Sequence, residues 1–210
     1  LFNVISRIYD PTAGSVHFQN TNLLPKAPYQ IAQMGISRTF QNLALWPKMT
    51  VLENVLTGAH VKGKQNFFSS MLRMGLTKEE QELQERAYTI LNNLELIQFA
   101  DQPCEGLPFG TMKRIELARA LINEPKLLLL DEPATGLNHS EVNELSHLIK
   151  TIRDEYELTI LLVEHHMGMV MGISDRVVVL DFGSKIAEGA PHEIQQNTAV
   201  INAYLGVSHD

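Results

Sequence analysis

Residues 127–133, Leu-Leu-Leu-Leu-Asp-Glu-Pro, decide the fold of this chain of 210 residues. Four consecutive leucines are apolar on both faces of an extended segment, as in a strand of a parallel sheet that helices cover on both sides. The strand ends at two acids, and ligands of open α/β sheets bind beyond the carboxyl ends of the strands. Asp131 and Glu132 are therefore the first candidate functional residues.

The two adjacent acids suit two different tasks, because neighbouring side chains of an extended segment point in opposite directions. One carboxylate can hold Mg²⁺, directly or through water, while the other orients and deprotonates an attacking water. The alternative is a pair of solvated acids that closes the strand without a chemical role. Both interpretations stay open on these residues alone.

Two more short apolar runs follow, at residues 158–163 and 177–180. Residues 139–154 between the first two runs have their apolar side chains on one side and indicate a helix. Strand, helix and strand in this order predict a βαβ unit. His165 follows the second strand, so we expect it at the same edge of the sheet as Asp131.

The ends of the chain carry weaker signals. Apolar residues at positions 1, 4, 5 and 8 predict a helix without a preceding cap or an initiator Met, so we expect the sequence to be truncated before Leu1. Strands are expected at residues 15–18 and, more weakly, at residues 35–40. Residues 181–184, Asp-Phe-Gly-Ser, predict a hairpin turn, and a terminal helix is expected at about residues 191–205.

The middle of the chain, residues 43–119, is expected to be mostly helical. Residues 50–53 and 77–80 each have the spacing of a capping box at the start of a helix. A further helix is expected at residues 112–122, after Gly110, whose small size would let a phosphate approach the backbone amides of the helix start. An ordinary N-terminal turn is the alternative for Gly110.

The composition excludes several classes of protein. Hydrophobic residues make up 44% and charged residues 20%, as in a globular domain with a sizeable core. A net charge of -7 argues against a nucleic-acid binder. The apolar runs are far shorter than the roughly 18 residues of a membrane span, and no signal peptide is visible. The single cysteine, Cys104, excludes a disulfide framework and is expected to be a packed or idle thiol rather than a nucleophile.

The order of the motifs resembles that of ABC-type ATPase domains, which are P-loop NTPases. The matching segments are a Q-loop at residues 39–42, a signature motif at 107–111, a Walker B motif at 127–133, a D-loop at 134–138 and a switch histidine at 164–165. The tail, including residues 172–183, resembles the ATP-binding subunits of bacterial branched-chain amino acid importers.

The resemblance implies one ABC nucleotide-binding domain over residues 1–210, incomplete at its N-terminus. A catalytic α/β sheet lobe would comprise residues 1–42 and 120–210, and an inserted helical lobe with the signature motif would comprise residues 43–119. Residues 175–208 would form the C-terminal segment typical of that importer family.

The resemblance also implies ATP and Mg²⁺ as ligands and assigns a role to each motif. Asp131 would order Mg²⁺, and Gln41 would touch the metal and sense the membrane partner. Glu132 would be the general base for the attacking water, and His165 would contact the γ-phosphate. In-line positioning and charge stabilisation would do most of the catalytic work.

The remaining site residues would act between two copies of the domain. Leu107, Gly110 and Thr111 would approach the ATP held by a second copy, and Asn138 would line the dimer seam. The signature here is Pro-Phe-Gly-Thr where the general pattern is Ser-Gly-Gly-Gln, so the serine contact to phosphate is missing. Asn138 and His166 stand at positions where Asp is common in ABC domains.

A complete phosphate-loop pattern, Gly-x-x-x-x-Gly-Lys-[Ser/Thr], is absent from the sequence. Residues 58–65 nearly fit, but they end in Gln and follow an expected helix rather than a strand, so we interpret them as a surface loop. The resemblance implies that the true loop lies immediately before Leu1. We therefore expect these 210 residues alone to bind ATP poorly.

The resemblance implies an ATP-hydrolysing subunit that energises import of a small polar solute, with branched-chain amino acids as the expected cargo. The expected partners are a second ATPase subunit, transmembrane permease subunits and, indirectly, a periplasmic or extracellular solute-binding protein, with no nucleic acid. The protein would lie peripherally on the cytoplasmic face of the bacterial inner membrane. The alternative is an ABC-like regulatory or assembly module without turnover, and the intact Glu132 favours hydrolysis.

Overall fold

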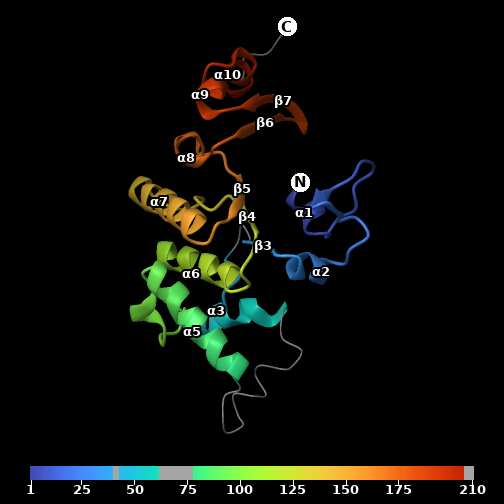
Figure 1. Ribbon diagram of the computed structural model, residues 1–210. Coiled ribbons are helices and arrows are strands. Elements are labelled where there is room, and N and C mark those ends of the chain that lie inside the picture. The colour runs from blue at the N-terminus through green and yellow to red at the C-terminus, as the bar shows by residue number, and fades with distance from the viewer. Residues whose placement is uncertain (40–42, 62–77, 206–210) are drawn as a thin grey trace. The chain divides into compact units, whose positions relative to one another are not determined.

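The computed structural model describes residues 1–39, 43–61 and 78–205. Three parallel strands form its main sheet, in the order β3 (Ile36–Arg38), β4 (Leu127–Asp131) and β5 (Thr159–Val163) (Figure 1). The four-leucine run is the central strand, and its last three leucines are fully buried. Helix α7 (His139–Glu155) connects β4 to β5, so the predicted strand–helix–strand unit is confirmed.

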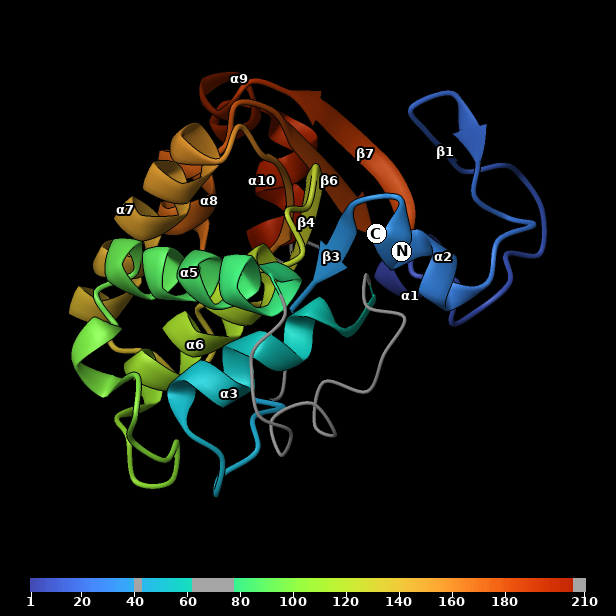
Figure 2. The ribbon, with the colours of Figure 1, turned by 60° about the horizontal axis from the view of Figure 1, so that its bottom comes forward.

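The predicted helical region consists of α3 (Val51–Leu56), α5 (Lys78–Asn93) and α6 (Phe109–Leu121), which pack against one another (Figure 2), with the short 3₁₀ helix η2 (Ile97–Phe99) between α5 and α6. The capping box at α3 is confirmed, because Thr50 accepts the N–H of Glu53 and the Glu53 carboxylate accepts the N–H of Thr50. Helix α6 begins earlier than predicted, so the candidate phosphate-binding residues lie inside its first turn.

Gly58 lies in the 3₁₀ helix η1 (Thr57–Val61), which continues directly from α3. The near match to a phosphate loop therefore follows a helix, as predicted, although residues 62–65 lie outside the described residues. The interpretation of its start as a loop is wrong, because η1 packs on α6. A Cβ built on Gly58 would lie 2.0 Å from the carbonyl oxygen of Arg119 and 2.7 Å from Cγ2 of Ile122, so this approach requires glycine.

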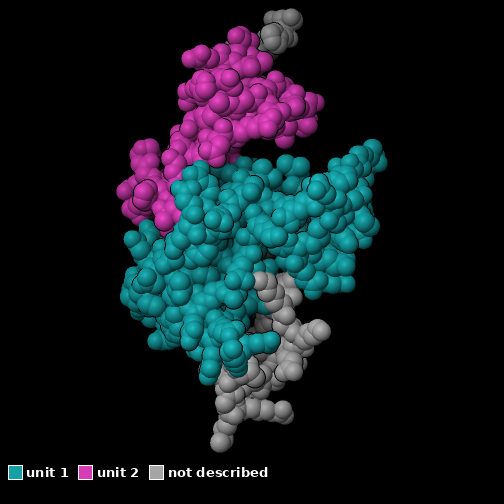
Figure 3. Space-filling view, viewed as in Figure 1, with its two compact units in different colours: residues 1–137, 152–163 teal, residues 138–151, 164–210 magenta. Residues whose placement is uncertain are grey.

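The backbone divides into two compact units, residues 1–137 with 152–163 and residues 138–151 with 164–210 (Figure 3). In the second unit, β6 (Val177–Asp181) and β7 (Ser184–Gly189) form the predicted hairpin. Phe182 and Gly183 at its tip have φ of 44° and 84°, as a two-residue turn that matches the strand twist requires.

The prediction of a single terminal helix after this hairpin is wrong. Two helices are present, α9 (Pro191–Gln195) and α10 (Thr198–Leu205). Asn197 separates them because its side-chain oxygen accepts the N–H groups of Ala199 and Val200 and so begins a new helix. No helix in the described ranges has both the length and the apolar character needed to cross a bilayer.

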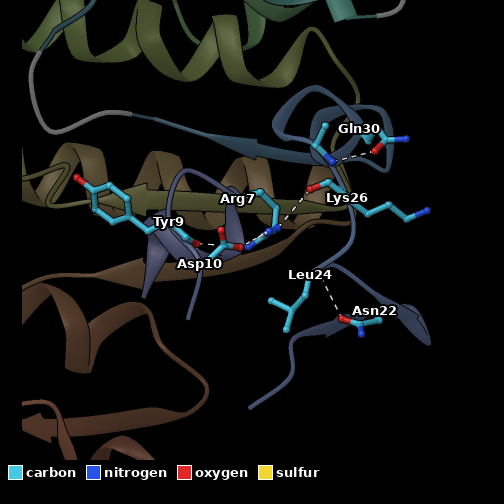
Figure 4. Close-up of polar contacts among 8 residues, drawn as sticks. Arg7, Tyr9, Asp10, Asn22, Leu24, Lys26 and Gln30 are labelled. Atoms are coloured by element: carbon cyan, nitrogen blue, oxygen red, sulfur yellow. Dashed lines mark hydrogen bonds and ion pairs between the residues drawn. The ribbon is translucent and has the colours of Figure 1, made fainter. Parts of the chain in front are cut away.

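The N-terminal segment is held by polar contacts around Arg7 (Figure 4). Helix α1 (Phe2–Ile5) ends earlier than the apolar spacing predicts, because Arg7 has a left-handed backbone with φ of 58°. The Arg7 side chain pairs with Asp10 at 2.6 Å and donates to the carbonyl oxygen of Lys26 at 3.3 Å. The rest of the segment comprises β1 (His17–Phe18), at the end of the predicted strand, its unpredicted partner β2 (Thr21–Asn22), and α2 (Pro28–Gln33).

Replacing Gly58 by alanine is expected to lower the free energy of unfolding by about 1–3 kcal/mol, because the new methyl group overlaps the α6 backbone. Urea unfolding measures the change. Gly172→Ala in helix α8 (Met167–Ile173) is the matched control, since a Cβ there meets nothing within 4 Å. The control protein should be as stable as the parent or slightly more stable. Equal losses of unfolding free energy in both variants would contradict the close approach of Gly58 to the α6 backbone.

Candidate functional site

The candidate acids lie where β4 and β5 end side by side. Asp131 is the last residue of β4 and pairs in register with Val163, the last residue of β5. The chain leaves the sheet at Glu132, whose N–H donates to the carbonyl oxygen of Val163 at 2.9 Å. Both acids are half-buried. Two carboxylates therefore lie at the carboxyl end of β4, one on its last residue and one on the residue that follows.

Glu132 has a backbone conformation that residues other than glycine rarely adopt, with φ of 46°. Such a conformation costs on the order of 1–3 kcal/mol, and strain of this kind clusters at functional sites. The Glu132 carbonyl oxygen accepts the N–H of Thr135 at 3.1 Å, and its Oε2 accepts the Thr135 hydroxyl at 3.3 Å. A tight turn thus holds this carboxylate at the end of β4.

Arg38 of β3 binds Asp131, a contact that the sequence analysis missed. Its Nη2 lies 2.7 Å from Oδ2 of Asp131, and the two side chains are 14% and 23% exposed. Its Nη1 donates to Oδ1 of Asn3 at 2.7 Å, and its guanidinium carbon lies 5.5 Å from the centre of the Phe2 ring. Arg38 therefore ties the acid on β4 to helix α1. A charged residue inside the weak strand candidate was the available signal.

Gly110 and Thr111 lie in the first turn of α6. Pro108 is the N-cap residue and supplies no side-chain cap. The N–H of Met112 is the first in α6 to bond back along the chain, to Pro108 at 3.0 Å, so the amides before it have no acceptor within the helix. These amides and the positive end of the helix dipole favour an anion. Leu107 directly precedes the cap.

Two charged residues of α6, one buried and one half-buried, hold the segment that follows the predicted Q-loop. Glu116 is 3% exposed and accepts the N–H of Ala44 at 3.1 Å, while Arg119 donates to the carbonyl oxygen of the same residue. Burial raises the pKa of the Glu116 carboxyl and lowers the pKa of Arg119, and in each case the opposite charge of the other opposes the shift. Gln41 itself lies outside the described residues.

Asn54 of α3 also holds this segment, through the backbone of Trp46. Its Oδ1 accepts the N–H of Trp46 at 2.8 Å, and its Nδ2 donates to the Trp46 carbonyl oxygen at 3.1 Å and to Sγ of Cys104 at 3.2 Å. Cys104 is a buried free thiol, as predicted, and burial raises its pKa. A thiol in this state is a poor nucleophile, so Cys104 contributes packing rather than chemistry.

Asn138 is the residue that begins α7. Its Oδ1 accepts the N–H groups of Ser140 and Glu141 at 3.0 and 3.1 Å. Its own N–H donates to Oε2 of Glu141 at 2.8 Å, which completes a reciprocal cap. The side chain is exposed, and the cap fixes where it lies on the turn.

His165 follows β5 in the second unit and is exposed. Its N–H donates to Oε2 of Glu164 at 2.9 Å, and the same oxygen accepts the N–H of His166 at 3.1 Å. His166 is the N-cap of α8, because its Nδ1 accepts the N–H of Met169 at 3.3 Å. The backbone around His165 is therefore fixed, while its own ring is exposed.

Comparisons with known proteins identify the family. The ABC transporter family matches residues 1–135. The family described as branched-chain amino acid ATP-binding cassette transporter matches residues 184–210. The chain belongs to the ABC transporter family of ATP-binding proteins.

Individual relatives match almost the whole chain. The high-affinity branched-chain amino acid transport ATP-binding protein LivG of Escherichia coli (strain K12) is 41% identical over 207 residues, covering 98% of this chain and 81% of LivG. The corresponding protein BraF of Pseudomonas aeruginosa is 38% identical with the same coverage. The crystal structure of MJ1267, an ATP-binding cassette of an ABC transporter in its ADP conformation, matches with a TM-score of 0.82 at 31% identity, covering 98% of this chain and 82% of MJ1267.

The predicted family, fold class and enzyme class are confirmed. The chain has the ABC ATPase fold of the P-loop NTPases. It is a nucleotide-binding ATPase subunit that energises transport, and subunits of this kind work as dimers with membrane permease subunits.

Removing the Arg38 guanidinium is expected to destabilise the fold. Arg38→Met leaves a half-buried carboxylate without its cation and should lower the free energy of unfolding by about 1–3 kcal/mol. In an Asp131→Asn background the same substitution should cost less, because the charge that Arg38 binds is gone. Urea unfolding of both single variants and the double variant measures the difference.

Arg176→Met is the matched control for Arg38→Met. Arg176 also pairs with an acid, Glu188, but its side chain is 72% exposed. Exposed ion pairs contribute little, so this variant should unfold as the parent does. Strictly additive losses for Arg38→Met and Asp131→Asn would show that the pair does not contribute to stability.

Proposed function

We propose that this protein hydrolyses ATP with the two acids at the end of β4 and thereby drives import of branched-chain amino acids. The observation that carries the proposal is the strained turn at Glu132, directly beyond a buried strand that ends in Asp131. The two acids have different partners, Arg38 and Thr135. Different surroundings suit two carboxylates for different tasks.

The proposed metal is Mg²⁺, and the donor set fits it. Asp131 supplies a hard carboxylate oxygen at the strand end, and Arg38 binds Oδ2, which leaves Oδ1 for a metal or a metal-bound water. The described ranges hold no group of three His, Cys, Asp or Glu side chains suited to a metal. Mg²⁺ commonly uses one or two carboxylates plus substrate phosphates, and it would neutralise phosphate charge here. Gln41 is the second proposed ligand.

Glu132 is the proposed general base. Its carboxylate is half-buried, and the Thr135 hydroxyl binds one of its oxygens, so the side chain has a preferred position. In that position it would accept the proton of a water that attacks the γ-phosphate. His165, exposed beyond β5, would contact the γ-phosphate itself.

A second copy of an ATPase subunit would complete the site. The first turn of α6, with Gly110 and Thr111, would receive the γ-phosphate of ATP bound to the other copy, with Leu107 beside it. Because this signature lacks the serine, backbone amides would make the phosphate contact. Asn138 would line the seam. A dimeric post-hydrolysis structure of the cassette MJ0796 with ADP and Pi, 26% identical with a TM-score of 0.72, supports this arrangement.

The cargo and the remaining partners are inferred from the relatives. LivG and BraF are named for high-affinity branched-chain amino acid transport, and the family that matches the C-terminal residues is also described by branched-chain amino acids. We infer that the partners of this protein are permease subunits and, indirectly, an external solute-binding protein. We also infer that it lies on the cytoplasmic face of the membrane. Residues 43–119 would be the helical lobe, residues 1–42 and 120–210 the catalytic lobe, and residues 175–208 the family-type C-terminal segment.

Glu132→Gln tests the proposed base. In the full-length protein within its transporter, this variant should lose about 10²–10⁴-fold in ATP turnover while it still binds ATP, because glutamine cannot accept the proton. Phosphate release and binding of a fluorescent ATP analogue measure the two properties. Glu79→Gln, at an exposed position on α5, is the matched control and should turn over ATP as the parent does. Unchanged turnover in Glu132→Gln would reject the assignment.

The cargo is tested by uptake into vesicles that hold the assembled transporter and its binding protein. Labelled leucine should accumulate when ATP is supplied on the side of this subunit, and excess unlabelled isoleucine or valine should compete. Labelled lysine of the same concentration is the control. Uptake of lysine instead of leucine would leave the ATPase standing and overturn the proposed cargo.

A further inference from the structure

The signature segment carries a phenylalanine where the general ABC pattern has a glycine, and the ring has a defined position. Phe109 is the first residue of α6 and is 39% exposed. A Cβ built on Gly136 would lie 3.0 Å from Cε1 and 3.2 Å from Cζ of Phe109. The edge of the ring therefore lies against the backbone of the turn at residues 134–137, which belongs to the same compact unit as α6.

Lys113, one turn further along α6, lies over the same ring. Its Nζ is 5.5 Å from the ring centre, within the range of a cation–π contact. Residues four apart on a helix share a face, which brings the lysine over Phe109. Lys113 is only 5% exposed, so this contact is shielded from water. The Phe109 ring thus contacts Lys113 of α6 on its face and lies close to Gly136 of the turn.

Gly136 meets two separate requirements at its position. Its φ of 84° lies in the left-handed region that favours glycine. A Cβ built on the observed backbone would also come within 3.0 Å of Cε1 of the Phe109 ring. The turn is closed by the N–H of Leu137, which donates to the Ala134 carbonyl oxygen at 3.1 Å. The phenylalanine and the glycine therefore fit each other.

We propose that Phe109 is a positioning residue that joins the start of α6 to the turn at residues 134–137. The inference rests on the proposed function, because Gly110 and Thr111 directly follow Phe109 and Asn138 lies two residues after Gly136. Those are the residues proposed to meet the second copy. The ring touches no ATP in this scheme. It makes the amides at the start of α6 and the turn that leads to Asn138 move together when two copies close on ATP.

Kinetics of the full-length protein in its transporter test the proposal. Phe109→Gly, which restores the general residue, should lower kcat/KM for ATP on the order of 10–100-fold, since small misplacements of a site cost this much. It should also reduce the Hill coefficient for ATP, which a purely structural role would not change. Phe109→Tyr keeps the ring and should restore both values. Phe109→Leu, which keeps apolar bulk without a ring, should behave like Phe109→Gly and replaces it if that variant folds poorly.

A double-variant cycle tests the contact itself. Gly136→Ala should lose activity through both backbone strain and displacement of the ring. In the Phe109→Gly background only the strain remains, so Gly136→Ala should cost less there. Additive losses, or parental kcat/KM and cooperativity in Phe109→Gly, would overturn the inference.

ATP-dependent dimer formation separates this inference from the proposed function. It is measured in the Glu132→Gln background, where bound ATP is not consumed. Phe109→Gly should need a higher ATP concentration to form the dimer than the Glu132→Gln parent does. If Glu132→Gln abolishes turnover but Phe109→Gly leaves dimer formation unchanged, only the role of Phe109 fails. If Glu132→Gln itself turns over ATP normally, the proposed function fails.

Discussion

The burial of β4 between β3 and β5 is the constraint on which the rest of the structure depends. A strand without an exposed edge or face has a single register, since a slip of one residue would expose leucines and bury the acids. That register fixes Asp131 opposite Val163 and forces the chain to leave the sheet at Glu132. The strained turn at Glu132 is tolerated because the buried strand before it cannot shift to relieve it.

A small number of polar side chains hold the neighbouring segments in place around this strand. Arg38 binds an acid on the neighbouring strand and an amide on α1. Glu116 and Arg119 bind both backbone groups of Ala44, and Asn54 does the same for Trp46. In each case a half-buried or buried side chain supplies the hydrogen bonds that an irregular segment cannot make by itself. The irregular segment that contains Ala44 and Trp46 is thereby held against α3 and α6.

The main strands and most helices were predictable because their signals are local. Four leucines, the capping box at residues 50–53 and the apolar period of α5 each act within a few residues. The contact of Arg38 with Asp131 was not predictable, because it joins residues that only the sheet register brings together. The break between α9 and α10 was missed because the helical spacing continues across Asn197, and its cap outweighs that spacing.

Two departures from the general ABC pattern keep the helix-capping role that an aspartate would have at the same position. Asn138 and His166 both stand where Asp is common, and both are N-cap residues, of α7 and α8. Asparagine and aspartate cap helices about equally well, and a neutral imidazole can accept the same N–H through Nδ1. Each replacement therefore preserves a side-chain acceptor at the helix start and removes the negative charge of an aspartate. In the proposed site, the loss of two negative charges would lower the repulsion of the ATP phosphates, so these departures are compatible with the proposed nucleotide binding.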